Sequence, residues 1–150
     1  TLLYQNMMRG GRRWSPVDAY LKPAMKRPNV RVITHALVEK VDLDGKRATG
    51  ITYRQGGQTK QVKARRDVIL SGGAINTPQL LQISGIGNPD DLGAIGVAVK
   101  HALPGVGRNF RDHYAVRVSA LVKGAPSLNE KSRGLPLVAE VLRYAFTRKG

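Results

Sequence analysis

The sequence contains no cysteine, which excludes a disulfide framework and thiolate chemistry and favours a reducing compartment. It also lacks any apolar stretch near the ~20 residues that a membrane-spanning helix needs. Residues 1–5 include neither a start methionine nor a basic region followed by an apolar one, so they predict no signal peptide. We therefore expect a protein without a transmembrane segment, either cytoplasmic or peripheral at the inner membrane.

Acidic and aromatic residues are scarce. Asp and Glu number 10 against 25 Lys and Arg, which gives a net charge of +15, and 5% of the residues are aromatic. Such an excess prompts a search for nucleic acid or an acidic surface as the partner. The basic residues are scattered, however, and no aromatic residues interleave with them as a base-stacking platform needs. We expect no nucleic-acid partner, while a basic nucleic-acid-binding or interaction module and a truncated, non-functional product stay open as alternatives.

The most informative stretch is Arg65–Gly87. Its apolar run Asp67–Leu70 ends in the small residues Ser71–Ala74, which predicts a buried strand that runs into a tight turn. Asn76 or Thr77 can then cap a helix that has a proline in its first turn. A turn without bulky side chains beside a helix N-terminus lets backbone N–H groups approach an anion or a nucleotide. Most strand–turn–helix units bind nothing, so a purely structural role is the alternative.

The segments before this stretch predict a helix and a β-meander. Met8–Arg13 is typical of a basic loop, and Ser15 and Pro16 open a helix that Pro28 ends. We expect three side chains of this helix to face inward: Tyr20, Leu21 and Met25. Period-two alternation then predicts a strand over Val30–His35 and a meander with glycine-containing turns. The meander strands are expected at Ala36–Asp42, Ala48–Arg54 and Thr59–Ala64.

The segments after it predict a mixture of helices and short strands. Asn88 can cap a short helix, and Leu135–Phe146 has the spacing of an amphipathic helix. Strands are expected at Val97–Val99 and Tyr114–Val122. The fold class is therefore α/β (α+β), with a boundary near His113.

Candidate catalytic residues are few. The three histidines, His35, His101 and His113, lie in no known catalytic motif, and no spacing of histidines and carboxylates suggests a metal site. Asp112 could orient the neighbouring His113 imidazole, but a pair that merely fixes the loop is the favoured interpretation. We predict no catalytic residue and no metal ligand in this sequence.

Three motifs resemble the glucose–methanol–choline (GMC) family of flavin-dependent oxidoreductases. Gly73–Gly87 fills every fixed position of the second signature of that family, and Leu103–His113 is similar to its Leu-Pro-Gly-Val-Gly-x-Asn-Leu-x-Asp-His loop. Gly11–Ser15 and the segments that follow it resemble the entry into the family's flavin domain. The likeness covers roughly residues 9–115 and is closest to the choline and alcohol dehydrogenase branch.

The resemblance implies FAD as the cofactor and a primary alcohol, choline-like or aliphatic or aromatic, as the small-molecule substrate. The alcohol would lose a proton to a base and a hydride to the flavin, and the electron acceptor would be oxygen or a quinone. The cofactor-binding residues that it implies are Val38, Ser71, Gly72, Gly73 and Ala74, at the adenosine end of FAD. No G-x-G-x-x-G turn occurs in this sequence. We therefore expect this sequence to be an internal piece of a longer protein, in which the glycine turn and the catalytic histidine lie outside the piece.

The resemblance also implies how the chain is divided. Residues 1–9 would end a substrate-domain segment, and 10–112 would form the central part of an incomplete Rossmann-like FAD-binding domain that includes the β-meander. Residues 113–150 would begin the substrate-binding domain. The chain alone is expected to be inactive.

Overall fold

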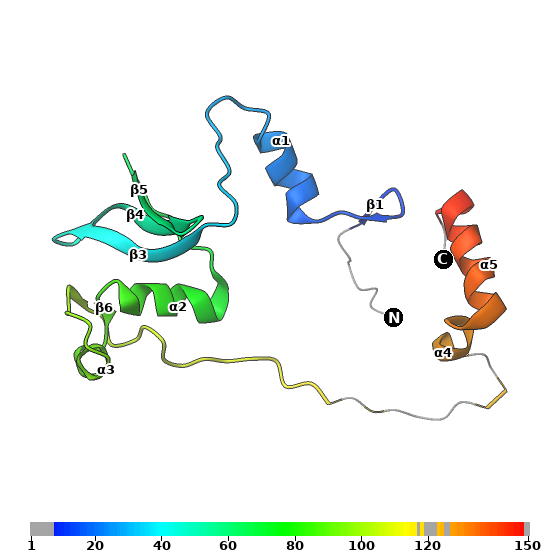
Figure 1. Ribbon diagram of the computed structural model, residues 1–150. Helices are drawn as coiled ribbons and strands as arrows, with labels where there is room; N and C mark the ends of the chain where they lie inside the picture. The colour runs from blue at the N-terminus through cyan, green and yellow to red at the C-terminus, as the bar shows by residue number, and fades with distance from the viewer. Residues whose placement is uncertain (1–7, 117, 119–122, 125–126, 149–150) are drawn as a thin grey trace. The chain divides into compact units, whose positions relative to one another are not determined.

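The computed structural model describes residues 8–116, 118, 123–124 and 127–148. These residues divide into two units, which are treated separately below (Figure 1). The larger unit is Ile33–Tyr114, and the smaller unit combines the described residues before Ile33 with those after Tyr114. Among the described residues, no helix combines the length and the apolarity needed to cross a bilayer.

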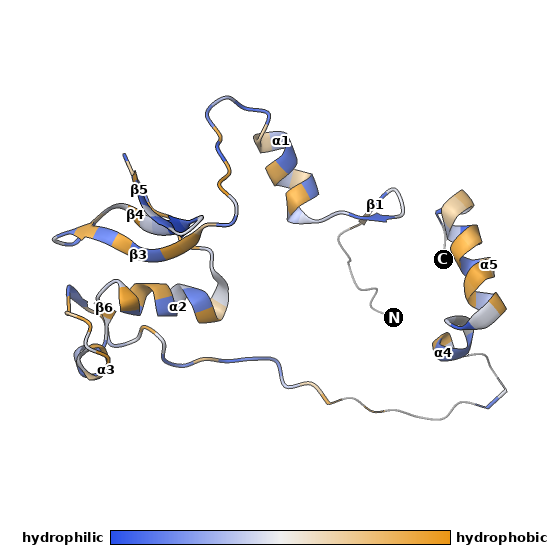
Figure 2. Ribbon diagram, in the orientation of Figure 1, coloured by the Kyte–Doolittle hydropathy of each residue, from blue (hydrophilic) through white to orange (hydrophobic). Residues whose placement is uncertain are grey.

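The larger unit is built on the predicted β-meander. Strands β3 (Leu37–Asp44), β4 (Arg47–Gln55) and β5 (Gln58–Lys63) pair antiparallel in that order. The β4–β5 turn, Gly56–Gly57, has φ angles of 58° and 77°. Two consecutive positive φ angles suit the right-handed twist of a two-residue hairpin, and glycine adopts them without steric cost. Strand β5 is exposed throughout and mostly hydrophilic (Figure 2), as suits the edge of a sheet.

Helix α2 (Gly73–Ile83) packs against β3 (Figure 1). The prediction that this helix is capped by Asn76 or Thr77 is wrong, because the helix begins several residues earlier. The hydroxyl Oγ1 of Thr77 instead reaches back and accepts a hydrogen bond from the Gly72 N–H at 3.0 Å. This bond gives a partner to one of the N–H groups that a helix start leaves free.

A small α/β cluster follows α2. Strand β6 (Ile86–Gly87) pairs parallel with β7 (His101–Ala102), and helix α3 (Pro89–Ala94) lies between them in sequence. The predicted Asn88 cap is confirmed, since its Oδ1 accepts hydrogen bonds from two N–H groups of the first turn of α3. The strand predicted at Val97–Val99 is wrong: the pairing occurs a few residues later, where the chain meets β6.

Two further predicted strands are wrong for one physical reason. Val30–His35 and Asp67–Leu70 are outside any strand, and no other described segment forms a ladder with either. Apolar or alternating patterns favour extended backbone, but a strand also needs a neighbour that accepts and donates its hydrogen bonds. His35 in addition has a positive φ of 54°, which interrupts the extended backbone.

The N-terminal part of the smaller unit contains a hairpin and a helix. Strands β1 (Met8–Arg9) and β2 (Arg12–Arg13) pair where only a loop was predicted. The predicted helix is present as a π-helical turn η1 (Val17–Leu21) followed by α1 (Lys22–Ala24). Pro23 cannot donate to the carbonyl four residues earlier, which accounts for the irregular turn before it.

The predicted inward face of that helix is partly wrong. Tyr20 is 73% exposed and Met25 is 52% exposed, because no described element of the unit covers them, while Leu21 is half-buried. The Ser15 cap is supported: its Oγ lies 2.7 Å from Asp18 Oδ2 and accepts from the Asp18 N–H at 3.4 Å.

The C-terminal part of the smaller unit is helical. Helix α4 (Leu128–Lys131) begins with a capping box between Ser127 and Glu130. Helix α5 (Gly134–Thr147) confirms the helix predicted at Leu135–Phe146, and its apolar residues are visible in Figure 2. The prediction of a strand at Tyr114–Val122 lies largely outside the described residues, and its described positions are not in a strand. Residues 1–7, most of the predicted 1–9 segment, also lie outside them.

Candidate functional site

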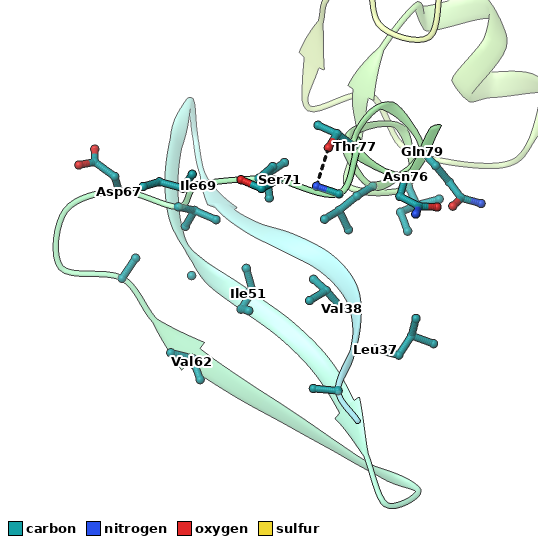
Figure 3. Close-up of a pocket in the computed structure, with 18 of the residues that line it drawn as sticks. Leu37, Val38, Ile51, Val62, Asp67, Ile69, Ser71, Asn76, Thr77 and Gln79 are labelled. Carbon is teal, nitrogen blue, oxygen red and sulfur yellow. Dashed lines mark hydrogen bonds between the residues drawn. The ribbon is translucent and has the colours of Figure 1, made fainter. Parts of the chain in front are cut away.

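A pocket of about 780 Å³ opens between the meander and the chain that leads into α2 (Figure 3). Its meander side is mainly apolar and includes Val38, Ile51 and Val62, with Lys63 beside them. Its other side is formed by residues 67–72 and by α2 from Asn76 to Ile83. Residues 67–70, predicted as a buried strand, are therefore neither a strand nor buried, with Ile69 85% exposed, and they form a wall of this pocket. Concave, mainly apolar sites with a few polar groups are typical of small-molecule binding.

The structure brings three of the five predicted site residues to this pocket. Val38 lines it from β3, and Ser71 and Gly72 line it from the turn before α2 (Figure 3). Ala74 does not line it and instead borders a second hollow of about 580 Å³. Gly73, the fifth residue, is the first residue of α2.

Val38 reaches the pocket beside a local irregularity of β3. The register of β3 on β4 shifts between Val38 and Lys40, where Glu39 is the additional residue. A bulge of this kind bends a strand and changes the direction of neighbouring side chains. The Glu39 carboxylate is paired with the Arg54 guanidinium of β4, so it remains with the sheet.

The turn before α2 leaves its backbone accessible. Gly73 has a φ of 85°, and a Cβ added there would meet no atom within 4 Å. Ser71–Ala74 are all exposed. A ligand could therefore approach this backbone without meeting a bulky side chain, and a nucleotide needs such an approach. The residues present thus fit the adenosine end of FAD.

Two other pocket residues were missed from the sequence. Thr77 lines the pocket and holds the Gly72 N–H, so it shapes the turn directly. The signal in the sequence was a hydroxyl residue five positions after a glycine. The cap prediction placed the start of the helix at this hydroxyl, whereas the hydroxyl accepts from the glycine N–H before the helix. Leu37, beside Val38, also lines the pocket although it was expected only as a strand residue.

The histidines form no catalytic arrangement with the groups near them. Asp112 Oδ1 accepts from the backbone N–H of His113 at 2.7 Å, which agrees with a pair that fixes the loop. Within the described parts of the chain, no three histidine, aspartate or glutamate side chains gather as a metal site would require. The pocket itself contains no histidine.

The sequence model of the family described as GMC oxidoreductase matches residues 2–115. The oxygen-dependent choline dehydrogenase of Staphylococcus saprophyticus subsp. saprophyticus is 44% identical over 147 residues, which are 98% of this chain and 26% of that protein. The enzyme of the same name from Staphylococcus xylosus is 42% identical over 147 residues, with the same coverage. The chain thus spans about a quarter of the length of these curated relatives.

Solved structures give the same picture. An FAD-dependent oxidoreductase from Chaetomium thermophilum superposes with a TM-score of 0.78 at 28% identity, over 92% of this chain and 25% of that one. Pyridoxine 4-oxidase from Mesorbium loti superposes with a TM-score of 0.60 at 33% identity, over 65% of this chain and 19% of that one.

Proposed function

The chain belongs to the GMC oxidoreductase family, and on that premise we propose that it supplies the adenosine-binding part of an FAD-dependent enzyme that oxidises a primary alcohol to the aldehyde. Support comes above all from one juxtaposition: Val38 and the turn residues Ser71 and Gly72 line the same pocket. The resemblance of the sequence to the family implies the same residues as cofactor contacts, independently of the geometry.

The residues of this chain would bind and orient the cofactor. The backbone of Ser71–Ala74 offers a surface without bulky side chains, and the apolar side of the pocket, with Val38, can cover an adenine ring. When bound, the flavin supplies the acceptor for the hydride that leaves the alcohol carbon. The proton of the alcohol would go to a base, for which the described residues offer no candidate. Choline is the first substrate to test, because curated relatives bear its name.

A chimera tests this proposal in a complete enzyme. The matching segment of the Staphylococcus saprophyticus enzyme would be replaced by this chain, and the purified protein examined for bound flavin by its visible absorbance. We expect a yellow protein whose flavin is bleached by choline without oxygen. A chimera that is folded, as its circular dichroism would show, but free of flavin would contradict the proposal.

The variant Gly73→Val then tests the turn itself. A valine there would add a branched side chain to the exposed backbone surface Ser71–Ala74 that we assign to the nucleotide, so we expect the chimera to lose most of its FAD. Gly45→Val is the matched control, because Gly45 also has a positive φ, 54°, and open space around an added Cβ, but it lies in the β3–β4 turn. Equal flavin content in the two variants would remove Gly73 from the site.

A further inference from the structure

Ser84 joins the end of helix α2 to strand β3 through its side chain. It is the C-cap residue of α2 and is 3% exposed. Its Oγ donates to the Leu80 carbonyl at 2.6 Å and accepts from the Val41 N–H at 2.8 Å. A hydroxyl has one proton to donate, so these two bonds fix both the rotamer and the direction of the O–H.

The partner of Ser84 on the sheet is equally buried. Val41 is 3% exposed, and among the described residues β3 is an edge strand of the meander that pairs with β4 alone. On the other side of β3 no described strand accepts a hydrogen bond from the Val41 N–H, and the Ser84 hydroxyl takes that place. A buried N–H without an acceptor is strongly disfavoured, so the bond holds α2 at one position along β3.

The two elements that Ser84 joins are the two sides of the pocket. Val38 lies on β3, three residues before Val41, with the register shift between Val38 and Lys40 separating them. Ser71 and Gly72 lead directly into α2. A displacement of α2 along β3 would change the separation between Val38 and this turn, while the meander could keep its own pairing.

We propose that Ser84 is a positioning residue for the nucleotide: its hydroxyl fixes α2 against β3 and thereby sets the width of the adenosine pocket. This inference rests on the proposed function. The residue acts through β3 and α2 and does not itself line the pocket. Loss of the Ser84 hydroxyl should therefore weaken FAD binding more than loss of an equally buried hydroxyl elsewhere in the sheet.

Thr52 provides that comparison. It is 7% exposed, and its Oγ1 donates to the Asp42 carboxylate at 2.8 Å, so it joins β4 to β3 within the meander. Both Thr52→Val and Ser84→Ala remove one buried hydroxyl from the larger unit. Only Ser84→Ala removes a bond between α2 and the sheet.

The experiment compares the two variants in the chimera described above. We expect Ser84→Ala to raise the FAD concentration for half-maximal activity about tenfold, the effect of losing one well-placed hydrogen bond. With FAD in excess, the kcat and the KM for choline should return to the values of the parent chimera. Thr52→Val should lower the melting temperature similarly but leave the FAD requirement within roughly twofold of the parent.

The outcomes separate the two proposals. A parent chimera that is folded but binds no FAD refutes the proposed function, and the role of Ser84 falls with it. A parent that binds FAD, with equal FAD requirements in the two variants, refutes only the role of Ser84. A second measurement is independent of FAD: in the full 150-residue chain, the Val41 amide should exchange its hydrogen faster in Ser84→Ala than in Thr52→Val, because only Ser84→Ala removes the acceptor of this amide. Equal exchange rates of the Val41 amide in the two variants would also overturn the inference.

Discussion

Replacing Gly85 by alanine should strongly destabilise the larger unit. Gly85 is buried directly after the C-cap of α2 and has a φ of 90°. A Cβ built there would lie 2.6 Å from the Ala98 carbonyl oxygen and 3.0 Å from Lys100 Cγ. Lys100 could move its flexible side chain, but Ala98 presents backbone. The substitution therefore forces either the end of α2 or the chain segment that leads into β7 to shift.

The magnitude follows from two contributions. An alanine in the left-handed region costs about 1–2 kcal/mol. The shift would also break the two hydrogen bonds that the Gly85 carbonyl accepts, from the Lys100 N–H at 2.8 Å and from the His101 N–H at 3.0 Å. Each of these bonds contributes about 1 kcal/mol. Together they predict a loss of about 3–4 kcal/mol, against roughly 4–12 kcal/mol of total stability for a unit of this size.

Urea unfolding followed by circular dichroism would measure this loss. Gly93→Ala is the matched control: Gly93 lies in helix α3 with a negative φ and no atom within 4 Å of an added Cβ. Alanine there should be neutral or stabilise the protein by up to about 1 kcal/mol. If the free energies of unfolding of Gly85→Ala and Gly93→Ala differ by less than about 0.5 kcal/mol, the steric reasoning at Gly85 is refuted.

Two further predictions concern helix starts. Asn88→Ala should cost about 0.5–2 kcal/mol in the same urea assay, since Asn88 Oδ1 caps α3, whereas Asn88→Asp should keep most of the stability. For the helix of the smaller unit, the Lys22 ammonium and the Ser15 hydroxyl and N–H lower the pKa of Asp18 from 3.8 to about 2. Because this pKa is depressed, the stabilisation is complete above pH 3.8 and is lost as the pH falls through 2. Carboxylate NMR should show the low pKa, and Lys22→Met should return it toward 3.8.

Local signals in the sequence were sufficient for the β4–β5 hairpin and for the cap of α3, although they missed the β1–β2 hairpin and misplaced the cap of α2. Gly56–Gly57 specified its turn because both positions need positive φ, and Asn88 specified its helix because a short polar side chain there reaches the first-turn N–H groups. In each case the interacting groups lie within a few residues of one another. The residues that cause the turn and the cap therefore lie within the local sequence pattern that predicts them.

Strands depend on distant residues, and here the sequence was a poorer guide. Val30–His35 and Asp67–Leu70 have strand patterns, yet no described segment provides a partner for either. Likewise, Tyr20 was assigned to a buried face, but burial requires an opposing element, and the described residues of its unit provide none. Periodicity specifies which face of a segment is apolar, while the covering surface is a separate, long-range fact.

The stretch Gly73–Gly87 shows why a long motif can combine two physical requirements. At its start, Gly73 keeps the backbone open where we place the nucleotide. At its end, the residues serve packing: Ser84 accepts from β3, Gly85 avoids the Ala98 carbonyl, and a Cβ at Gly87 would lie 3.3 Å from Gln82 Cγ. The residues that we propose to contact the cofactor could be inferred from the resemblance, because the family motif concerns binding. The role of Ser84 could not, since its acceptor function depends on a strand more than forty residues away. In our proposal the open turn binds the nucleotide only if its distance to the opposite wall of the pocket is fixed, so the two ends of the motif would serve one site.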